Sequence, residues 1–106
     1  MGSIVIKIRP DQLKNPDADL RYVIPDRLIE LTANRLSNDG YDYLEDEYTT
    51  MAIFLKSEHP QEDASRILEI FKTEIFLGNN IYDTSIIAVC DNNDCDLDEY
   101  TTVLPQ

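Results

Sequence analysis

The chain has 106 residues, of which 21 are acidic and 9 basic, giving a formal net charge of -12. This length supports one modest core, so we expect a single α+β domain over residues 1–106. The hydrophobic content of 42% indicates a folded chain despite its charge. Basic grooves and membrane-length apolar runs are both missing from the sequence, so we expect no nucleic-acid partner, no membrane partner and a cytoplasmic location.

The first predicted element is a strand over residues 4–9, where isoleucines occupy alternate positions until Pro10. Residues 11–23 are mixed polar and predict a loop. A helix is then expected to begin near Pro25, because proline suits the first helical position, and to stop at Gly40.

Residues 41–56 predict a hairpin. A short strand at 41–44 is followed by the acidic turn Glu45-Asp46-Glu47, and a longer strand at 48–56 has apolar residues on one face. The tip of this hairpin is therefore expected to be acidic.

A second helix is predicted from Pro60 to the Gly78-Asn79-Asn80 turn, with acidic residues in its first turn and apolar residues at helical spacing up to Ile75. A strand at 83–90 is apolar on both faces, which is typical of the middle of a sheet. A last strand is expected at 100–104.

The order of predicted elements is strand, helix, strand, strand, helix, strand, strand. This order predicts an α+β fold with an antiparallel-rich sheet and two helices on one face. The arrangement resembles the ferredoxin-like β-α-β-β-α-β plan with an extra C-terminal strand.

The pentapeptide DEYTT occurs twice, at residues 46–50 and 98–102, inside the two stretches that contain no Lys or Arg. These stretches, 36–55 and 73–106, hold five and seven acids respectively, while the remaining nine acids balance the nine bases. All of the excess charge therefore lies around the two copies. Solubility and protection of strand edges would explain acidic turns without a partner.

Five of the six tyrosines also lie in these stretches. Tyrosine mixed with carboxylates is typical of a polar surface that binds a basic protein, since Tyr supplies contact area and the acids pair with Arg or Lys. We therefore predict partner contacts at Asp42, Tyr43, Glu45, Asp46, Glu47, Asp94, Asp96, Asp98, Glu99 and Tyr100.

Two copies of one motif are what an internal duplication could leave, but convergence of similar helices and strand starts is the favoured explanation. In both cases the copies are expected to enter strands. If those strands are neighbours, the preceding acidic turns meet at one end of the sheet and form one acidic rim.

The residues that carry chemistry in other proteins are sparse here. Cys90 and Cys95 lack further soft ligands nearby, so we expect a strand side chain and an exposed loop thiol rather than a zinc site. The single histidine, His59, precedes a proline and is expected near a helix cap. Only three glycines are present, and no phosphate-binding loop is formed by them. We predict no catalytic residues, no metal site and no cofactor, and hence no enzyme.

The run at residues 91–99 alternates oxygen donors, as calcium requires. The EF-hand template fails, because starting it at Asp91 puts Asp96 where glycine is needed, and starting it at Asp94 puts Pro105 where the bidentate Glu belongs. Weak calcium binding in another geometry stays open.

A small acidic α+β chain with carboxylates and tyrosines on its loops resembles the bacterial toxin-immunity proteins. The resemblance lies in general character rather than in a motif. It implies a cognate toxin domain as partner, often a basic nuclease, which is inhibited when its active-site face is covered.

Two other functions fit the same composition. A nucleic-acid mimic that blocks a DNA-binding enzyme needs acids spaced like phosphates along an extended surface. A small non-catalytic regulatory subunit could be acidic for solubility alone. Steep salt dependence of binding would separate the first two functions from the third.

Overall fold

The structure is a computed structural model that describes residues 1–92 and 95–104. Within these residues the elements follow one another as β1 (Gly2–Ile8), the short 3-10 helix η1 (Pro10–Gln12), α1 (Leu20–Leu31), β2 (Leu36–Tyr43), β3 (Met51–Ser57), α2 (Pro60–Thr73), β4 (Ser85–Cys90), the 3-10 helix η2 (Leu97–Glu99) and β5 (Thr101–Leu104).

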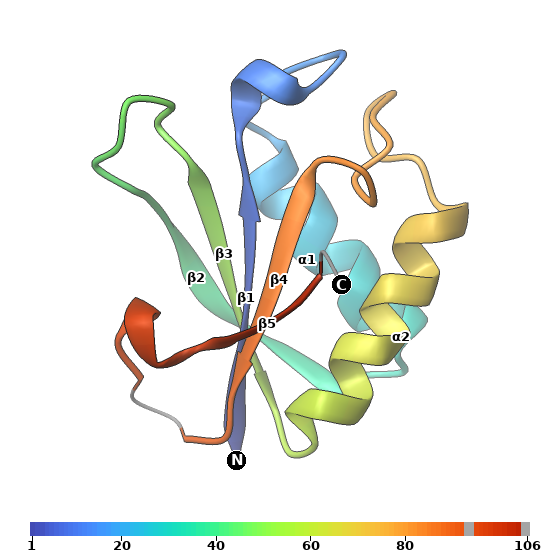
Figure 1. The fold of residues 1–106 in the computed structure, drawn as a ribbon. Helices are drawn as coiled ribbons and strands as arrows, with labels where there is room; N and C mark the ends of the chain where they lie inside the picture. Colours follow the sequence, from blue (N-terminus) through green and yellow to red (C-terminus); the bar gives the residue numbers. More distant parts are fainter. Residues whose placement is uncertain (93–94, 105–106) are drawn as a thin grey trace.

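The strands form one sheet in the order β2-β3-β1-β4-β5, and every neighbouring pair is antiparallel (Figure 1). The crossover through α1 leads from β1 to β2, with β3 between them, and the crossover through α2 leads from β3 to β4, with β1 between them. β1 therefore lies at the centre of the sheet. This is the ferredoxin-like plan with an added C-terminal strand, so the predicted fold class is confirmed.

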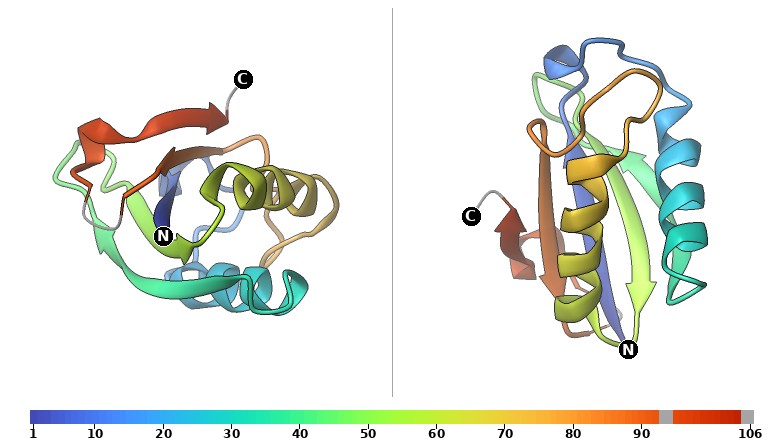
Figure 2. Two further views of the ribbon diagram at one scale, coloured as in Figure 1. Left: turned by 90° about the horizontal axis from the view of Figure 1, so that it is seen from below. Right: turned by 90° about the vertical axis from the view of Figure 1, so that its right-hand side faces the viewer.

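Both helices cover one face of the sheet, which we call the helix-covered face, whereas η2 and β5 lie on the opposite, helix-free side (Figure 2). Ile4, Ile6 and Ile8 of β1 point to the helix-covered face and are fully buried. They pack in the main core with residues such as Leu28 of α1 and Phe71 of α2. The period-two pattern of the first strand therefore supplies the centre of the core.

The helix-free face has a smaller apolar cluster of its own. Val5, Ala52 and Ala88 come from three adjacent strands and are buried there. Leu97 and Tyr100 pack against them from the β4–β5 connection. This connection thus covers part of the face that the helices leave open.

The first helix begins earlier than predicted. α1 begins at Leu20, and Pro25 lies inside it rather than at its start. Leu20, Ile24 and Leu28 recur at helical spacing, and all three are fully buried. The earlier start adds Leu20 and Ile24 to the helix, and burying these two side chains contributes about 3–6 kcal/mol. This gain outweighs the roughly 3 kcal/mol that an interior proline costs a helix.

The end of the first helix also differs from the prediction. Ala33 and Asn34 adopt positive φ angles of 52° and 65°, and the chain reverses there instead of at Gly40. Leu36 consequently opens β2 and is 2% exposed. Gly40, with a φ of 91°, lies at a bulge within β2, where the pairing register with β3 shifts. The expected short strand at 41–44 is therefore the end of a longer one.

The second helix is confirmed at its start. α2 begins at Pro60 and carries Glu62 and Asp63 in its first turn. It ends at Thr73, earlier than expected, so Ile75 is 63% exposed instead of continuing the apolar stripe. Neither α2 nor any other helix of the described residues is long and apolar enough to cross a membrane.

The two C-terminal strands were predicted within two residues of their observed limits. β4 lies between β1 and β5 and is therefore an interior strand, as its apolar sequence indicated. One of its side chains, Ile86, remains 40% exposed on the helix-free face. β5 is short and forms the edge beside β4.

The two cysteines form a disulfide, which corrects the prediction of separate thiols. Cys90 is the last residue of β4, and Cys95 lies in the connection to β5 with a Cα–Cα distance of 6.6 Å. The expectation failed because the sequence spacing does not reveal that the chain turns back immediately after β4.

Candidate functional site

The tip of the β2–β3 hairpin is organised by Asp46. Its carboxylate accepts hydrogen bonds from the Thr50 hydroxyl at 2.6 Å, the Thr50 backbone N–H at 3.0 Å and the Tyr48 N–H at 3.1 Å. These bonds, that from the Thr50 hydroxyl above all, lower the pKa of Asp46 below its ordinary value. Asp42, Glu45 and Glu47 are exposed around this fixed turn. The tip is therefore a hydrogen-bonded turn with an anionic surface.

A second acidic element is η2. Asp96 and Glu99 form a reciprocal capping box, in which the Asp96 N–H donates to Glu99 Oε1 at 3.1 Å. Asp98 lies between them and, like both partners, is exposed. Leu97 points inward to the Val5 cluster. Within residues 96–99, Leu97 therefore packs inward and the other three residues expose their carboxylates.

The two acidic turns do not meet at one end of the sheet. β3 begins beside Ile8, whereas β4 ends beside Ser3, so the turns leave opposite ends of β1. β3 and β5 are separated by β1 and β4, and the condition for a single rim is not met. The predicted rim is wrong because the pentapeptide does not determine the direction of the strand that follows it.

The two turns nevertheless share one side of the molecule. The β4–β5 connection folds back over the helix-free face, and η2 lies toward the β2 edge of the sheet, below the hairpin tip on the same side of the molecule in Figure 1 (Figures 1 and 2). Leu44 from the tip and Leu97 from η2 pack against the same buried cluster. We call the exposed acids of these two turns the acidic flank; its members are Asp42, Glu45, Asp46, Glu47, Asp96, Asp98 and Glu99.

Within the part of the chain that the structure describes, the acidic flank forms no ion pair, although the charge of Arg9 lies close enough to interact with that of Glu47. Ion pairs are frequent around the helices, such as Arg27 with Glu74 at 2.8 Å. The base beside the tip, Arg9, pairs with Asp11 at 2.7 Å and lies 3.3 Å from the centre of the Tyr48 ring. The predicted residue Asp94 falls outside the described residues.

The two predicted tyrosines contribute to the fold itself. Tyr43 packs against the main core, and its hydroxyl accepts a hydrogen bond from Arg21 Nη1 at 3.1 Å. Tyr100 packs against the small cluster on the helix-free face. Both side chains are half-buried, so they offer less surface to a partner than the carboxylates beside them.

Sequence reasoning missed an aromatic cluster at the edge strand β2. Tyr22 of α1 and Tyr41 of β2 are 45% and 40% exposed, with ring centres 5.7 Å apart. The Arg21 guanidinium lies 4.8 Å from the Tyr22 ring and 5.0 Å from the Tyr41 ring. The hydrogen bond with Tyr41, together with one to Arg21, lowers the pKa of Tyr22, whereas the bond with Tyr22 raises the pKa of Tyr41. The signal for this cluster was Arg-Tyr at 21–22, in a segment expected to be a loop.

A shallow groove of about 500 Å³ adjoins the tip on the helix-free face. Leu44, Tyr48 and Ile86 contribute apolar surface to it, and Lys7 lies on the same wall. The lining is mixed, because Arg9, Asp46 and Asp83 also contribute to it. Apolar side chains surrounded by polar and charged ones are the usual composition of a protein interface.

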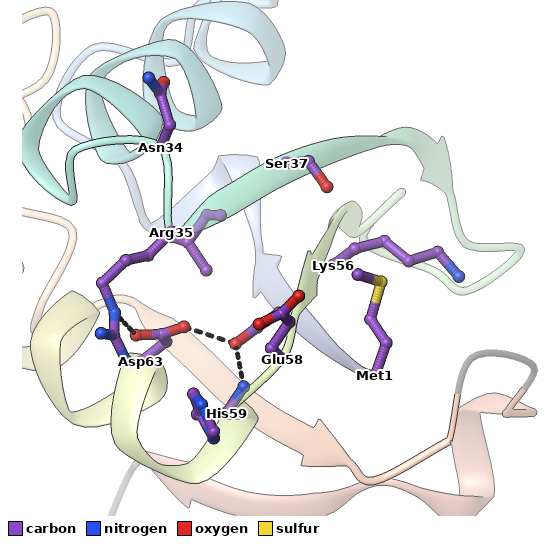
Figure 3. A pocket seen from close by; sticks show the side chains of 10 residues that line it. Met1, Asn34, Arg35, Ser37, Lys56, Glu58, His59 and Asp63 are labelled. Carbon is purple, nitrogen blue, oxygen red and sulfur yellow. Dashed lines mark hydrogen bonds and ion pairs between the residues drawn. The ribbon is translucent and has the colours of Figure 1, made fainter.

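A second pocket, of about 340 Å³, lies where β3 meets α2 (Figure 3). Asp63 is 1% exposed and accepts hydrogen bonds from Arg35 Nε at 2.7 Å and from the Ser57 hydroxyl at 2.5 Å. The backbone N–H of His59 donates to the Ser57 oxygen at 3.0 Å. His59 is confirmed as the residue that caps α2, though its side chain makes no capping bond. These contacts anchor the first turn of α2, and the buried Ser57 hydroxyl is already engaged.

The carboxylates of η2 are close enough to face one cation. Single oxygen atoms of Asp96, Asp98 and Glu99 lie within 4.8 Å of one another, and all three residues are exposed. Calcium takes six to eight oxygen ligands, so three exposed carboxylates form an incomplete set.

Comparison with known proteins finds no matching family model, no matching curated protein and no matching solved structure. A function for this chain is therefore inferred from its own geometry and charge.

Proposed function

We propose that the chain is a non-catalytic immunity protein that binds and inhibits a basic toxin domain through the acidic flank. The observation that carries the proposal is that the flank carboxylates have no ion-pair partners among the described residues, whereas Arg27, Arg35 and Lys72 on the helix side pair with acids. Clustered like charges oppose folding by mutual repulsion, and a partner of opposite charge removes that repulsion.

The charge and the groove have different roles in this proposal. Exposed carboxylates raise the association rate with a basic protein, and they pair with its Arg and Lys side chains at the rim of the interface. The groove at Leu44, Tyr48 and Ile86 supplies the apolar surface that excludes water at the centre. The toxin is inhibited because this interface covers its basic active-site face.

The proposed place of action is the cytoplasm, where a delivered toxin domain would act. The regulatory subunit and the nucleic-acid mimic remain the competing functions. A subunit that is acidic for solubility has no need of unpaired acids on one flank. A mimic needs a row of phosphate-like charges, whereas these carboxylates occupy two turns on the helix-free side.

Two variants with equal charge change test the proposal. The flank triple, Glu45→Gln with Glu47→Gln and Asp98→Asn, removes three exposed carboxylates while keeping Asp46 and the capping box. The helix triple, Glu30→Gln with Glu62→Gln and Glu69→Gln, removes three carboxylates that pair with helix-side bases. Each tagged protein is used to capture partners from native cells, and captured proteins are identified by mass spectrometry and purified.

The proposal predicts capture of a basic protein whose enzymatic activity is inhibited by the wild-type chain. The flank triple should bind it at least about tenfold more weakly at low salt, and the helix triple should bind it like wild type. Equal binding by both triples, or a partner whose activity is unaffected, would contradict the proposal. Competition by unrelated duplex DNA would identify a nucleic-acid mimic instead.

A further inference from the structure

The disulfide connects the central region of the fold to the second half of the acidic flank. Cys90 ends β4 and is 7% exposed, because it lies beside Ser3 of β1. Cys95 is half-buried and begins a segment that we call the arm, residues 95–100. The Ser3 hydroxyl also donates to the Asn92 carbonyl at 3.2 Å. The disulfide thereby joins the start of the arm to the sheet by a covalent bond in addition to the peptide chain itself.

The arm has little structure that could hold it without this bond. Its only helical turn, η2, has three residues, and a single 3-10 turn is not stable alone. Leu97 and Tyr100 are half-buried on the cluster of Val5, Ala52 and Ala88. The capping box is internal to the arm and so does not attach it to the sheet. The arm is therefore held by the disulfide at one end, by the partial burial of Leu97 and Tyr100 in the middle, and by β5 at the other end.

We propose that the Cys90–Cys95 disulfide is a redox switch that fixes the arm on the helix-free face when oxidised and releases it when reduced. The consequence for partner binding rests on the proposed function: release moves Asp96, Asp98 and Glu99 away from their fixed positions relative to the hairpin tip. The structural switch itself does not depend on any partner.

The chemistry is thiol–disulfide exchange with a dithiol reductant. A reductant thiolate attacks the more exposed Cys95 sulfur, breaks the bond to Cys90 and forms a mixed disulfide at Cys95. The second thiol of the reductant then displaces Cys95. The two thiol protons of the reductant end on Cys90 and Cys95, and the reductant becomes a cyclic or intramolecular disulfide. The reverse exchange with an oxidised dithiol closes the switch.

The expected compartment gives this switch a regulatory meaning. Structural disulfides persist in oxidising compartments, whereas disulfides in the cytosol are usually transient and redox-sensing. In a reducing cytoplasm the arm is released and only the carboxylates of the hairpin tip keep their place, so we expect a partner to bind more weakly there until oxidation restores the complete acidic flank. In an oxidising compartment the arm is held permanently.

Amide hydrogen exchange of the full chain, read by mass spectrometry or NMR, tests the switch directly. We expect the oxidised protein to contain no titratable thiols and the dithiothreitol-treated protein to contain two. On reduction, exchange across the arm should become at least about tenfold faster, while exchange in β1 and β3 stays unchanged. The variant Cys95→Ser should show the fast arm in both conditions.

Three results would overturn the switch. These are two free thiols in the air-oxidised protein, an arm whose exchange is the same before and after reduction, and loss of protection in β1 and β3 together with the arm. The last result would make the disulfide a support for the whole fold. Because the free chain is measured, failure here leaves the proposed function standing, and failure of partner capture leaves the switch standing.

Discussion

The two sides of the sheet differ in how they use charge. On the helix-covered side, acids and bases pair with one another, as Arg35 does with Asp63 and Lys72 with Glu69, around a fully buried core. On the helix-free side, Lys56 pairs with Asp39 at 3.7 Å, but the acids of the flank beside the three small buried residues have no ion-pair partner among the described residues. The larger core thus lies on one side of the sheet, and the surface proposed to bind a partner lies on the other.

Removing an aromatic ring from the helix-covered core should have the largest effect. Phe71 is 1% exposed and packs edge-to-face on Phe76 with ring centres 5.7 Å apart. We expect Phe71→Ala to lower the free energy of unfolding by about 4 kcal/mol, because it leaves a cavity. The matched change on the helix-free side, Leu97→Ala, should lower it by only about 1 kcal/mol, since Leu97 is half-buried. Urea unfolding gives both values, and equal losses would contradict the comparison.

The buried carboxylate at the start of α2 should come next. Asp63→Ala leaves the Ser57 hydroxyl without its acceptor and separates Arg35 from its closest partner. We expect a loss of about 3 kcal/mol in the free energy of unfolding. Glu62→Ala, one residue earlier and exposed, should cost less than about 1 kcal/mol. A small loss for Asp63→Ala would mean that the network around it does not anchor the helix.

The hairpin tip allows a smaller, local test by pH titration. We expect the NMR-measured pKa of Asp46 to lie below the ordinary value of about 3.9, to rise in Thr50→Val and to stay low in Thr50→Ser. Because the folded-state pKa is the lower one, the stabilisation is complete above the unfolded-state value and is lost as the pH falls through the folded-state pKa. An ordinary pKa in the wild type would show that the Thr50 bonds do not organise the tip.

Much of the fold could be predicted from local pattern. Alternating isoleucines identified β1, and Pro60 with its acidic first turn identified α2. The start of α1 was missed because Pro25 has the local signature of a helix start, while the burial that favours an earlier start at Leu20 comes from distant residues. Local sequence thus predicted elements well where packing and propensity agree.

The site was harder to predict because it depends on how distant segments lie in space. Charge counting identified the two acidic turns, and it could not tell that they leave opposite ends of β1. It also could not show that the β4–β5 connection folds back so that Leu97 shares a cluster with Leu44. The disulfide and the Tyr22–Tyr41 pair were missed for the same reason.

The most direct test of the charge asymmetry compares the flank triple with the helix triple by urea unfolding at about 10 mM salt. Both variants remove three negative charges. We expect the flank triple to be more stable than wild type by up to about 1 kcal/mol, because repulsion is relieved, and the helix triple to be less stable by a similar amount, because ion pairs are lost. The two effects should shrink together at about 500 mM salt. Shifts of the same sign and size in both triples would show that only total charge matters, and would contradict the account.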